Sequence, residues 1–233
     1  MTPERVFIPN HSPALFDRAE KSSKRGEGVS TCILAVSATE AFTHDLTEWY
    51  KFCADHKLEC PNNKDKGLFS PDRFTTCFSV LHKYTDLENS ILEKISKIES
   101  SRERDSLLNK YLELYAICKN GEKADKGANP YQDFSLLIKI RNSIVHTKGE
   151  MLSNSNGYSK IDGHPYFIET LSQKNVISKN QSFSSWLNLI ENKNFAKWSL
   201  EIAEEVIENA INMLPKTEIS ELFKDQASLH KTA

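Results

Sequence analysis

The sequence predicts an all-α protein, a bundle of about five or six helices with one small β-hairpin insertion. Glycine and proline each occur eight times among 233 residues, and this glycine content is roughly half of the usual frequency of about 7%. Apolar residues recur at the three- and four-residue spacing of helices over long stretches. They make up 39% of the chain, against 27% charged residues, which is typical of a protein that folds around a buried core.

Two helices are expected at the start of the chain. A short helix is predicted to begin after Ser12 or Pro13 and to stop at Arg25-Gly26. Ser30 is expected to cap a long helix that runs to about residue 57, because serine accepts hydrogen bonds from the first free amides of a helix. The apolar residues that support the long helix are Leu34, Ala38, Ala41, Phe42, Leu46, Trp49 and Phe52.

The middle of the chain predicts three more helices. One is expected to start at Ser70-Pro71-Asp72, where proline occupies the first turn, and to run to about residue 100. The second carries apolar residues from Leu108 to Cys118 and ends at Asn120-Gly121. The third opens at Pro130, and its pattern stops at Lys148-Gly149.

The pattern changes in residues 151–180, which are rich in serine, asparagine and glycine. Asp162-Gly163, between Ile161 and Tyr166-Phe167-Ile168, predicts a β-hairpin. A short helix is expected at 186–190, and a long closing helix holds apolar residues from Phe195 to Met213, before Pro215. The tail after residue 216 is expected to be a weak or frayed helix.

Charge and composition exclude several classes of protein. Lys and Arg total 30 and Asp and Glu total 32, a net charge of −2, so any nucleic-acid site has to be a local basic cleft. No stretch has the 18 apolar residues of a membrane-spanning helix, and no signal peptide is visible in residues 1–10. Five cysteines without a C-x-x-C motif indicate reduced thiols. We therefore expect a cytoplasmic protein without a membrane partner.

The helix at 133–148 contains the residues best suited to chemistry. On a helical wheel, Arg141 falls in the middle of an apolar stripe, formed by Phe134, Leu137, Ile138, Ile144 and Val145. A guanidinium stays charged, so it has to pair with an acid or face an anion in a cleft or interface. Asn142 and His146 lie on one shoulder of that stripe. Arg can bind phosphate and His can move a proton. An Arg–carboxylate bridge that ties helices together explains the same spacing.

The segment Arg141-Asn142-Ser143-Ile144-Val145-His146 resembles the R-N-x-x-x-H motif (R-x4-H) of the HEPN superfamily of α-helical domains. Residues 133–140 are similar to the lead-in of the family's motif helix, and residues 34–42, where small residues meet Glu40, resemble its early helix. The resemblance implies one HEPN-like domain over residues 1–233. Its core would be about 30–148 plus a closing helix at 195–214, and residues 149–194 would be an insertion.

The resemblance also implies an activity. Many HEPN proteins are metal-independent endoribonucleases that act as toxins or antiviral (abortive-infection) effectors, with a composite site across a homodimer interface. Arg141 would bind the scissile phosphate, His146 would act as general base or acid, and Asn142 would position one of them. No cofactor is expected. RNA is the expected substrate, a second copy the expected partner, and an antitoxin or defence-system protein a further partner.

Three residues are expected to support this site. Glu40 would hold Arg141 or His146 in place, although a polar residue at the shoulder of its helix can equally point to water. Lys139 and Lys148 add positive charge around the motif, which suits RNA. Some family members carry a tyrosine two residues after the motif histidine; Lys148 stands there, so AMPylation of such a tyrosine is not supported.

Other motifs are weaker. Cys53, His56 and Cys60, with Cys77 and His82 further on, could supply zinc ligands, but they match no closed structural site and also fit an ordinary core stripe. Motifs of serine hydrolases, P-loop proteins and dinucleotide enzymes are absent from the sequence. Two functions stay open: a HEPN-type ribonuclease, and a non-catalytic helical module of the same fold that binds protein or RNA.

Overall fold

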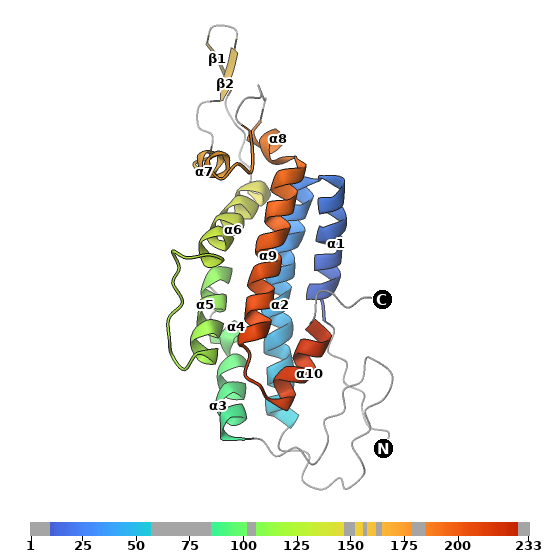
Figure 1. The fold of residues 1–233 in the computed structure, drawn as a ribbon, viewed down its shortest axis with the longest axis vertical. Coiled ribbons are helices and arrows are strands. Elements are labelled where there is room, and N and C mark those ends of the chain that lie inside the picture. Colours follow the sequence, from blue (N-terminus) through green and yellow to red (C-terminus); the bar gives the residue numbers. More distant parts are fainter. Residues whose placement is uncertain are drawn as a thin grey trace. The chain divides into compact units, whose positions relative to one another are not determined.

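The computed structural model describes residues 10–56, 85–101, 106–146, 152–155, 158–161, 165–178 and 185–227. These residues are predominantly helical, so the fold is all-α in class (Figure 1). The helices are α1 (Ser12–Arg25), α2 (Gly28–His56), α3 (Asp86–Ile95), α4 (Ile98–Ser101), α5 (Leu107–Cys118), α6 (Tyr131–Val145), α7 (Phe167–Gln173), α8 (Trp186–Ile190), α9 (Lys193–Met213) and α10 (Glu218–Ala227). None of the described helices combines the length and apolarity needed to cross a membrane.

The chain divides into two compact units. The first unit contains the described residues of Ala41–Ala124 and Ala210–Ser228, together with Asn10 and His11. The second unit contains the described residues of Ser12–Glu40 and Asp125–Asn209. Both boundaries at 40/41 and 209/210 fall inside helices, α2 and α9. The prediction of a single domain stays a prediction.

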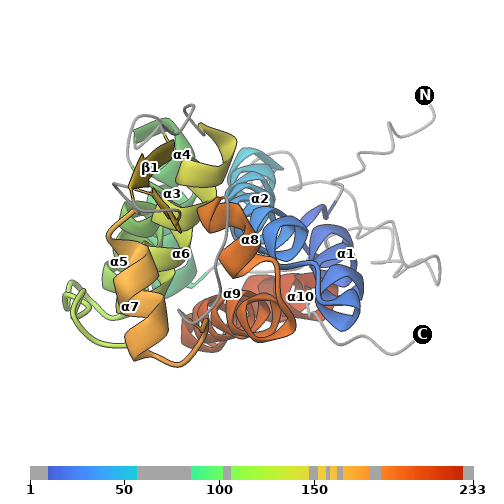
Figure 2. The same cartoon turned by 90° about the horizontal axis from the view of Figure 1, so that it is seen from above.

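In the second unit, α1, the first half of α2 and most of α9 run alongside one another (Figures 1 and 2). Gly26 ends α1 with a φ of +77°, a conformation that glycine adopts without strain. Gly28 then brings the start of α2 against α8. A Cβ atom at Gly28 would lie 1.8 Å from the carbonyl oxygen of Ile190, and the Val29 amide donates to Glu191 Oε2 at 2.8 Å. The close approach therefore requires glycine.

In the first unit, the second half of α2 packs against α5 and α10. The Phe42 ring is stacked on Tyr111, with centroids 6.3 Å apart, and meets Phe223 of α10 edge-on at 5.8 Å. Two hydrogen bonds also join α2 to α10. Trp49 Nε1 donates to the Ile219 carbonyl at 3.1 Å, and the Tyr50 hydroxyl lies 2.7 Å from Ser220 Oγ. The C-terminal helix is thus anchored by buried contacts. Of the two alternatives expected for the tail, a helix or a frayed end, residues 218–227 adopt the helix.

Several predicted helices are confirmed, namely α1, α5, α8 and α9. The prediction of one continuous helix at 70–100 is wrong in its described part. Its start lies outside the described residues, and Thr85 begins a separate helix with a reciprocal capping box to Glu88. This helix, α3, ends at Ile95. The helix predicted to reach Lys148 already ends at Val145.

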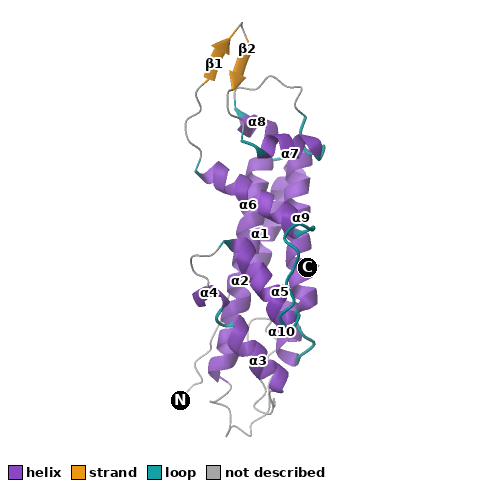
Figure 3. Cartoon of the chain, turned by 90° about the vertical axis from the view of Figure 1, so that its left-hand side faces the viewer, coloured by secondary structure: helices purple, strands orange, loops and turns teal. Residues whose placement is uncertain are grey.

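The hairpin predicted around Asp162-Gly163 is wrong in its position. The two strands are Leu152–Ser155 (β1) and Tyr158–Ile161 (β2), paired antiparallel with Leu152 opposite Ile161 (Figure 3). Phe167 and Ile168 belong to α7, where they are buried together with Leu171. A short apolar run cannot be assigned to helix or strand from periodicity alone. In the structure Phe167 lies in a helix and packs edge-on against Trp186 of α8.

Candidate functional site

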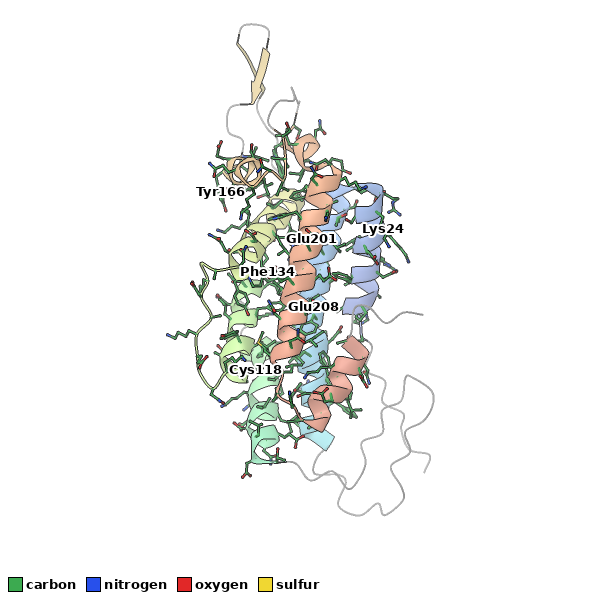
Figure 4. The ribbon with its side chains drawn as sticks, in the orientation of Figure 1. Lys24, Cys118, Phe134, Tyr166, Glu201 and Glu208 are labelled. Atoms are coloured by element: carbon green, nitrogen blue, oxygen red, sulfur yellow. The ribbon has the colours of Figure 1, made fainter. Side chains whose placement is uncertain are left out.

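Helix α6 carries the predicted motif, and its local sequence accounts for its placement. Pro130 occupies the position before the helix, and Asp133 lies in its first turn, where a carboxylate is favoured by the helix dipole. Asp133 Oδ1 pairs with Lys174 Nζ at 2.9 Å, which ties the start of α6 to the end of α7. Phe134, labelled on α6 in Figure 4, and Leu137 are fully buried. These contacts fix the rotation of the helix.

Arg141 lies on the buried side of α6, as predicted. At about 100° per residue its side chain projects close to the direction of Phe134 and Leu137, and it is only 22% exposed. Its Nη2 atom donates to Glu40 Oε2 of α2 at 3.3 Å, and the Glu40 side chain is 58% exposed. The guanidinium therefore reaches from an apolar face to a carboxylate at the protein surface.

The surroundings of Arg141 leave part of its hydrogen-bonding capacity unused. Its Nε atom is buried and has no hydrogen-bond partner within the described part of the chain. The buried thiol of Cys32 lies close enough to sense the charge: burial raises the pKa of Cys32, and Arg141 acts in the opposite direction. An arginine with an unused donor suits an anionic ligand, because a guanidinium offers five donors in a fixed fork.

Asn142 and His146 lie on the exposed face of α6. His146 follows the last helical residue, and its backbone amide donates to the Asn142 carbonyl at 3.0 Å. Five residues separate Arg141 from His146, or about 140° around the helix axis. The two motif side chains of one chain thus point in different directions. Val145, predicted to belong to the buried stripe, is 54% exposed, because it lies at the end of the helix.

Lys139 also lies on the exposed face of α6, and it approaches Tyr166, a residue that no sequence motif assigns to the site. Its Nζ atom lies 5.8 Å from the centroid of the Tyr166 ring, within the range of a cation–π contact. Tyr166 precedes α7 and is 62% exposed (Figure 4). The sequence predicts that this tyrosine lies in a β-strand, and no local motif indicates that it belongs to a site.

The structure thus brings together Arg141 with Glu40, and Lys139 with Tyr166. Lys148 lies outside the described residues. Of the considered zinc ligands, Cys60, Cys77 and His82 also lie outside them, and burial raises the pKa of Cys53. Within the described ranges, no group of three or more His, Cys, Asp and Glu side chains could hold a metal ion.

Comparison with known proteins identifies no relative. No protein-family model, no curated protein and no solved structure matches the chain.

Proposed function

We propose that this protein is a metal-independent endoribonuclease of HEPN type, which acts as a toxin or antiviral effector through a composite site between two copies of the chain. The observation that carries the proposal is the setting of Arg141. Its guanidinium is only 22% exposed, is held by Glu40 at 3.3 Å and has an unused buried donor. Asn142 and His146 follow on the exposed face of the same helix.

The proposed reaction needs one cation and one proton carrier. Arg141 binds the non-bridging oxygens of the scissile phosphate and stabilises the charge that develops on them. His146 either accepts the proton of the adjacent 2′-hydroxyl or donates one to the leaving 5′-oxygen, and water carries out the other proton transfer. The 2′-oxygen forms a bond to phosphorus as the bond from phosphorus to the 5′-oxygen breaks. The products are a 2′,3′-cyclic phosphate and a 5′-hydroxyl end.

The direction of the motif side chains supports a composite site. In one chain Arg141 and His146 project about 140° apart, so a single phosphate is more easily held between residues of two facing helices. Val145 beside His146 exposes an apolar side chain, and contact with a second copy would cover it. These observations favour a homodimer in which the α6 helices meet.

The proposal is tested by cleavage of total cellular RNA by the purified full chain in EDTA. Wild type is compared with Arg141→Ala, Arg141→Lys and His146→Ala. His44→Ala is the matched control, because His44 is also exposed but lies outside the motif. We expect Arg141→Ala and His146→Ala to lose at least about a hundredfold in rate, Arg141→Lys to lose less, and His44→Ala to cut like wild type.

Equal cutting by all variants would contradict the proposal. A second candidate function is that of a non-catalytic helical module. The Arg141–Glu40 ion pair favours it, because such a pair can serve only to join α6 to α2. In that case no form cuts RNA, His146→Ala changes nothing, and Arg141→Ala lowers the midpoint of urea unfolding. Light scattering of the wild-type chain tests the homodimer independently.

A further inference from the structure

We propose that Tyr166 is a stacking platform for one unpaired base of a single-stranded RNA bound along the exposed face of α6; this inference rests on the proposed function and assigns its substrate class. Three large hydrophobic side chains are strongly exposed within the described residues, and Tyr166 is the only aromatic one, at 62%. An aromatic ring can stack on any base. The ring lies beside the helix that carries the motif (Figure 4).

The Tyr166 ring is held in place without being covered. Its edge meets the Phe167 ring at a centroid distance of 6.0 Å and an interplanar angle of 71°. Phe167 is buried and packs edge-on against Trp186 at 5.2 Å. Lys139 approaches the ring from α6. A base that stacks on Tyr166 therefore meets a ring whose orientation is already fixed by packing, which reduces the entropy lost on binding.

The charge around Tyr166 favours a phosphate backbone. Helix α6 has one carboxylate, Asp133, which is buried and paired with Lys174. Its exposed face carries Lys139. Glu169, one turn after Tyr166, accepts a hydrogen bond from Gln173 at 3.4 Å and is the acid nearest in sequence. An ammonium beside an open aromatic ring is the usual combination for single-stranded nucleic acid, because one group binds the backbone and the other the base.

The spacing along α6 links this platform to the proposed catalytic residues. Lys139 and His146 are seven residues apart, so they share one helix face and are separated by about 10 Å along the axis. A strand that follows this face would place one base on Tyr166 and a neighbouring phosphate near His146. Stacking requires a base whose face is free, which paired bases in a helix do not offer. Single-stranded RNA is therefore the substrate class that the arrangement favours.

Binding, not cleavage, tests the inference. The full-length His146→Ala protein in EDTA is titrated with a short unstructured RNA that carries fluorescein at one end and 2-aminopurine inside. Added to this background, Tyr166→Ala is expected to raise the Kd about tenfold and to abolish the quenching of 2-aminopurine. Tyr166→Phe is expected to keep the affinity and the quenching. Leu87→Ala is the control, because Leu87 is 51% exposed and lies in the first unit. The corresponding duplex should bind independently of Tyr166→Ala.

Each outcome separates this inference from the proposed function. Binding of single-stranded RNA that Tyr166→Ala leaves unchanged overturns the inference alone. Absence of RNA binding overturns both. A change in molar mass on Tyr166→Ala, with RNA affinity and quenching unchanged, identifies a protein–protein contact and overturns the inference. Quenching that depends on Tyr166, in a protein whose wild type cuts no RNA, supports the inference and contradicts the ribonuclease.

Discussion

The guanidinium of Arg141 and the carboxylate of Glu40 meet at 3.3 Å although 101 residues separate them in the sequence. The contact joins α6 to the first half of α2 within the second unit. It places a cation, which has to be paired, at the edge of an apolar face. The pair therefore has two roles to be separated, holding the helices together and orienting Arg141.

A double-mutant cycle measures the first role. Glu40→Gln, Arg141→Met and their combination are expected to show a coupling free energy of at most about 1 kcal/mol in urea unfolding, because Glu40 is 58% exposed and water screens the pair. Methionine keeps the apolar stem of arginine. The exposed pair Asp17–Lys21, at 2.6 Å, is the control cycle. A coupling above about 3 kcal/mol would show that the pair behaves as a buried salt bridge.

Gly28→Ala is expected to destabilise the protein by about 3 kcal/mol. Inside a helix, alanine is normally favoured over glycine by about 1 kcal/mol, so the sign of the effect is informative. The new Cβ would lie 1.8 Å from the Ile190 carbonyl oxygen, a backbone atom that can move only if α8 moves. The midpoint and slope of urea unfolding by circular dichroism measure the change.

Gly127→Ala is the control for this substitution. There the nearest atom is Oδ1 of the exposed Asp125 side chain, at 3.3 Å, which can rotate away. We expect a change within about 0.5 kcal/mol. Equal effects at the two positions would mean that α8 does not approach Gly28 as described.

Ser199→Ala is expected to leave stability unchanged or to raise it by up to about 1 kcal/mol. Ser199 of α9 is fully buried, and its hydroxyl has no hydrogen-bond partner in the described part of the chain. Removing an unsatisfied buried hydroxyl removes a desolvation penalty. Tyr50→Phe provides the contrast, because the Tyr50 hydroxyl is bonded to Ser220 and its loss should cost about 1 kcal/mol. Thermal unfolding of both variants beside wild type measures the two effects. Destabilisation by Ser199→Ala would imply that the Ser199 hydroxyl has a hydrogen-bond partner.

The carboxyl group of Glu27 is expected to titrate below its ordinary range. The hydrogen bonds from Arg25, at 2.6 and 2.9 Å, lower the pKa of Glu27, and desolvation opposes them. Because the folded pKa is depressed, the stabilisation is present above the unfolded pKa of about 4.3 and is lost as pH falls through the folded value. Arg25→Gln should raise the pKa of Glu27 in a carboxyl-carbon NMR titration. Lys24→Gln, which removes the partner of Glu20, should leave it in place.

The sequence was informative wherever a local signal marks the end of a helix. Gly26 ends α1 because it can adopt a positive φ, and Pro215 follows the end of α9 because proline cannot continue a helix. The amphipathic period of α6 by itself predicts that Arg141 lies on the buried side of the helix. These features depend on residues within a turn or two of one another.

The hairpin was misplaced for the opposite reason. Phe167 and Ile168 form a run too short to distinguish strand from helix, and only tertiary packing, such as that of Phe167 against Trp186 of α8, identifies their buried face. The exposure of Tyr166 could not be predicted for the same reason, because it follows from the position of α7 beside α6. The R-x4-H spacing suggested a phosphate site, whereas nothing within that motif indicated an aromatic neighbour.

The sequence by itself determined the all-α class, several helix ends and the helix that carries Arg141 and Asn142 and is followed by His146, since helical periodicity and capping act over a few residues. Only the tertiary structure decided that Glu40 is the partner of Arg141, that Gly28 touches Ile190 and that Lys139 faces Tyr166. Such contacts join residues far apart in the chain. They depend on how helices pack, and the composition of each helix leaves several packings open.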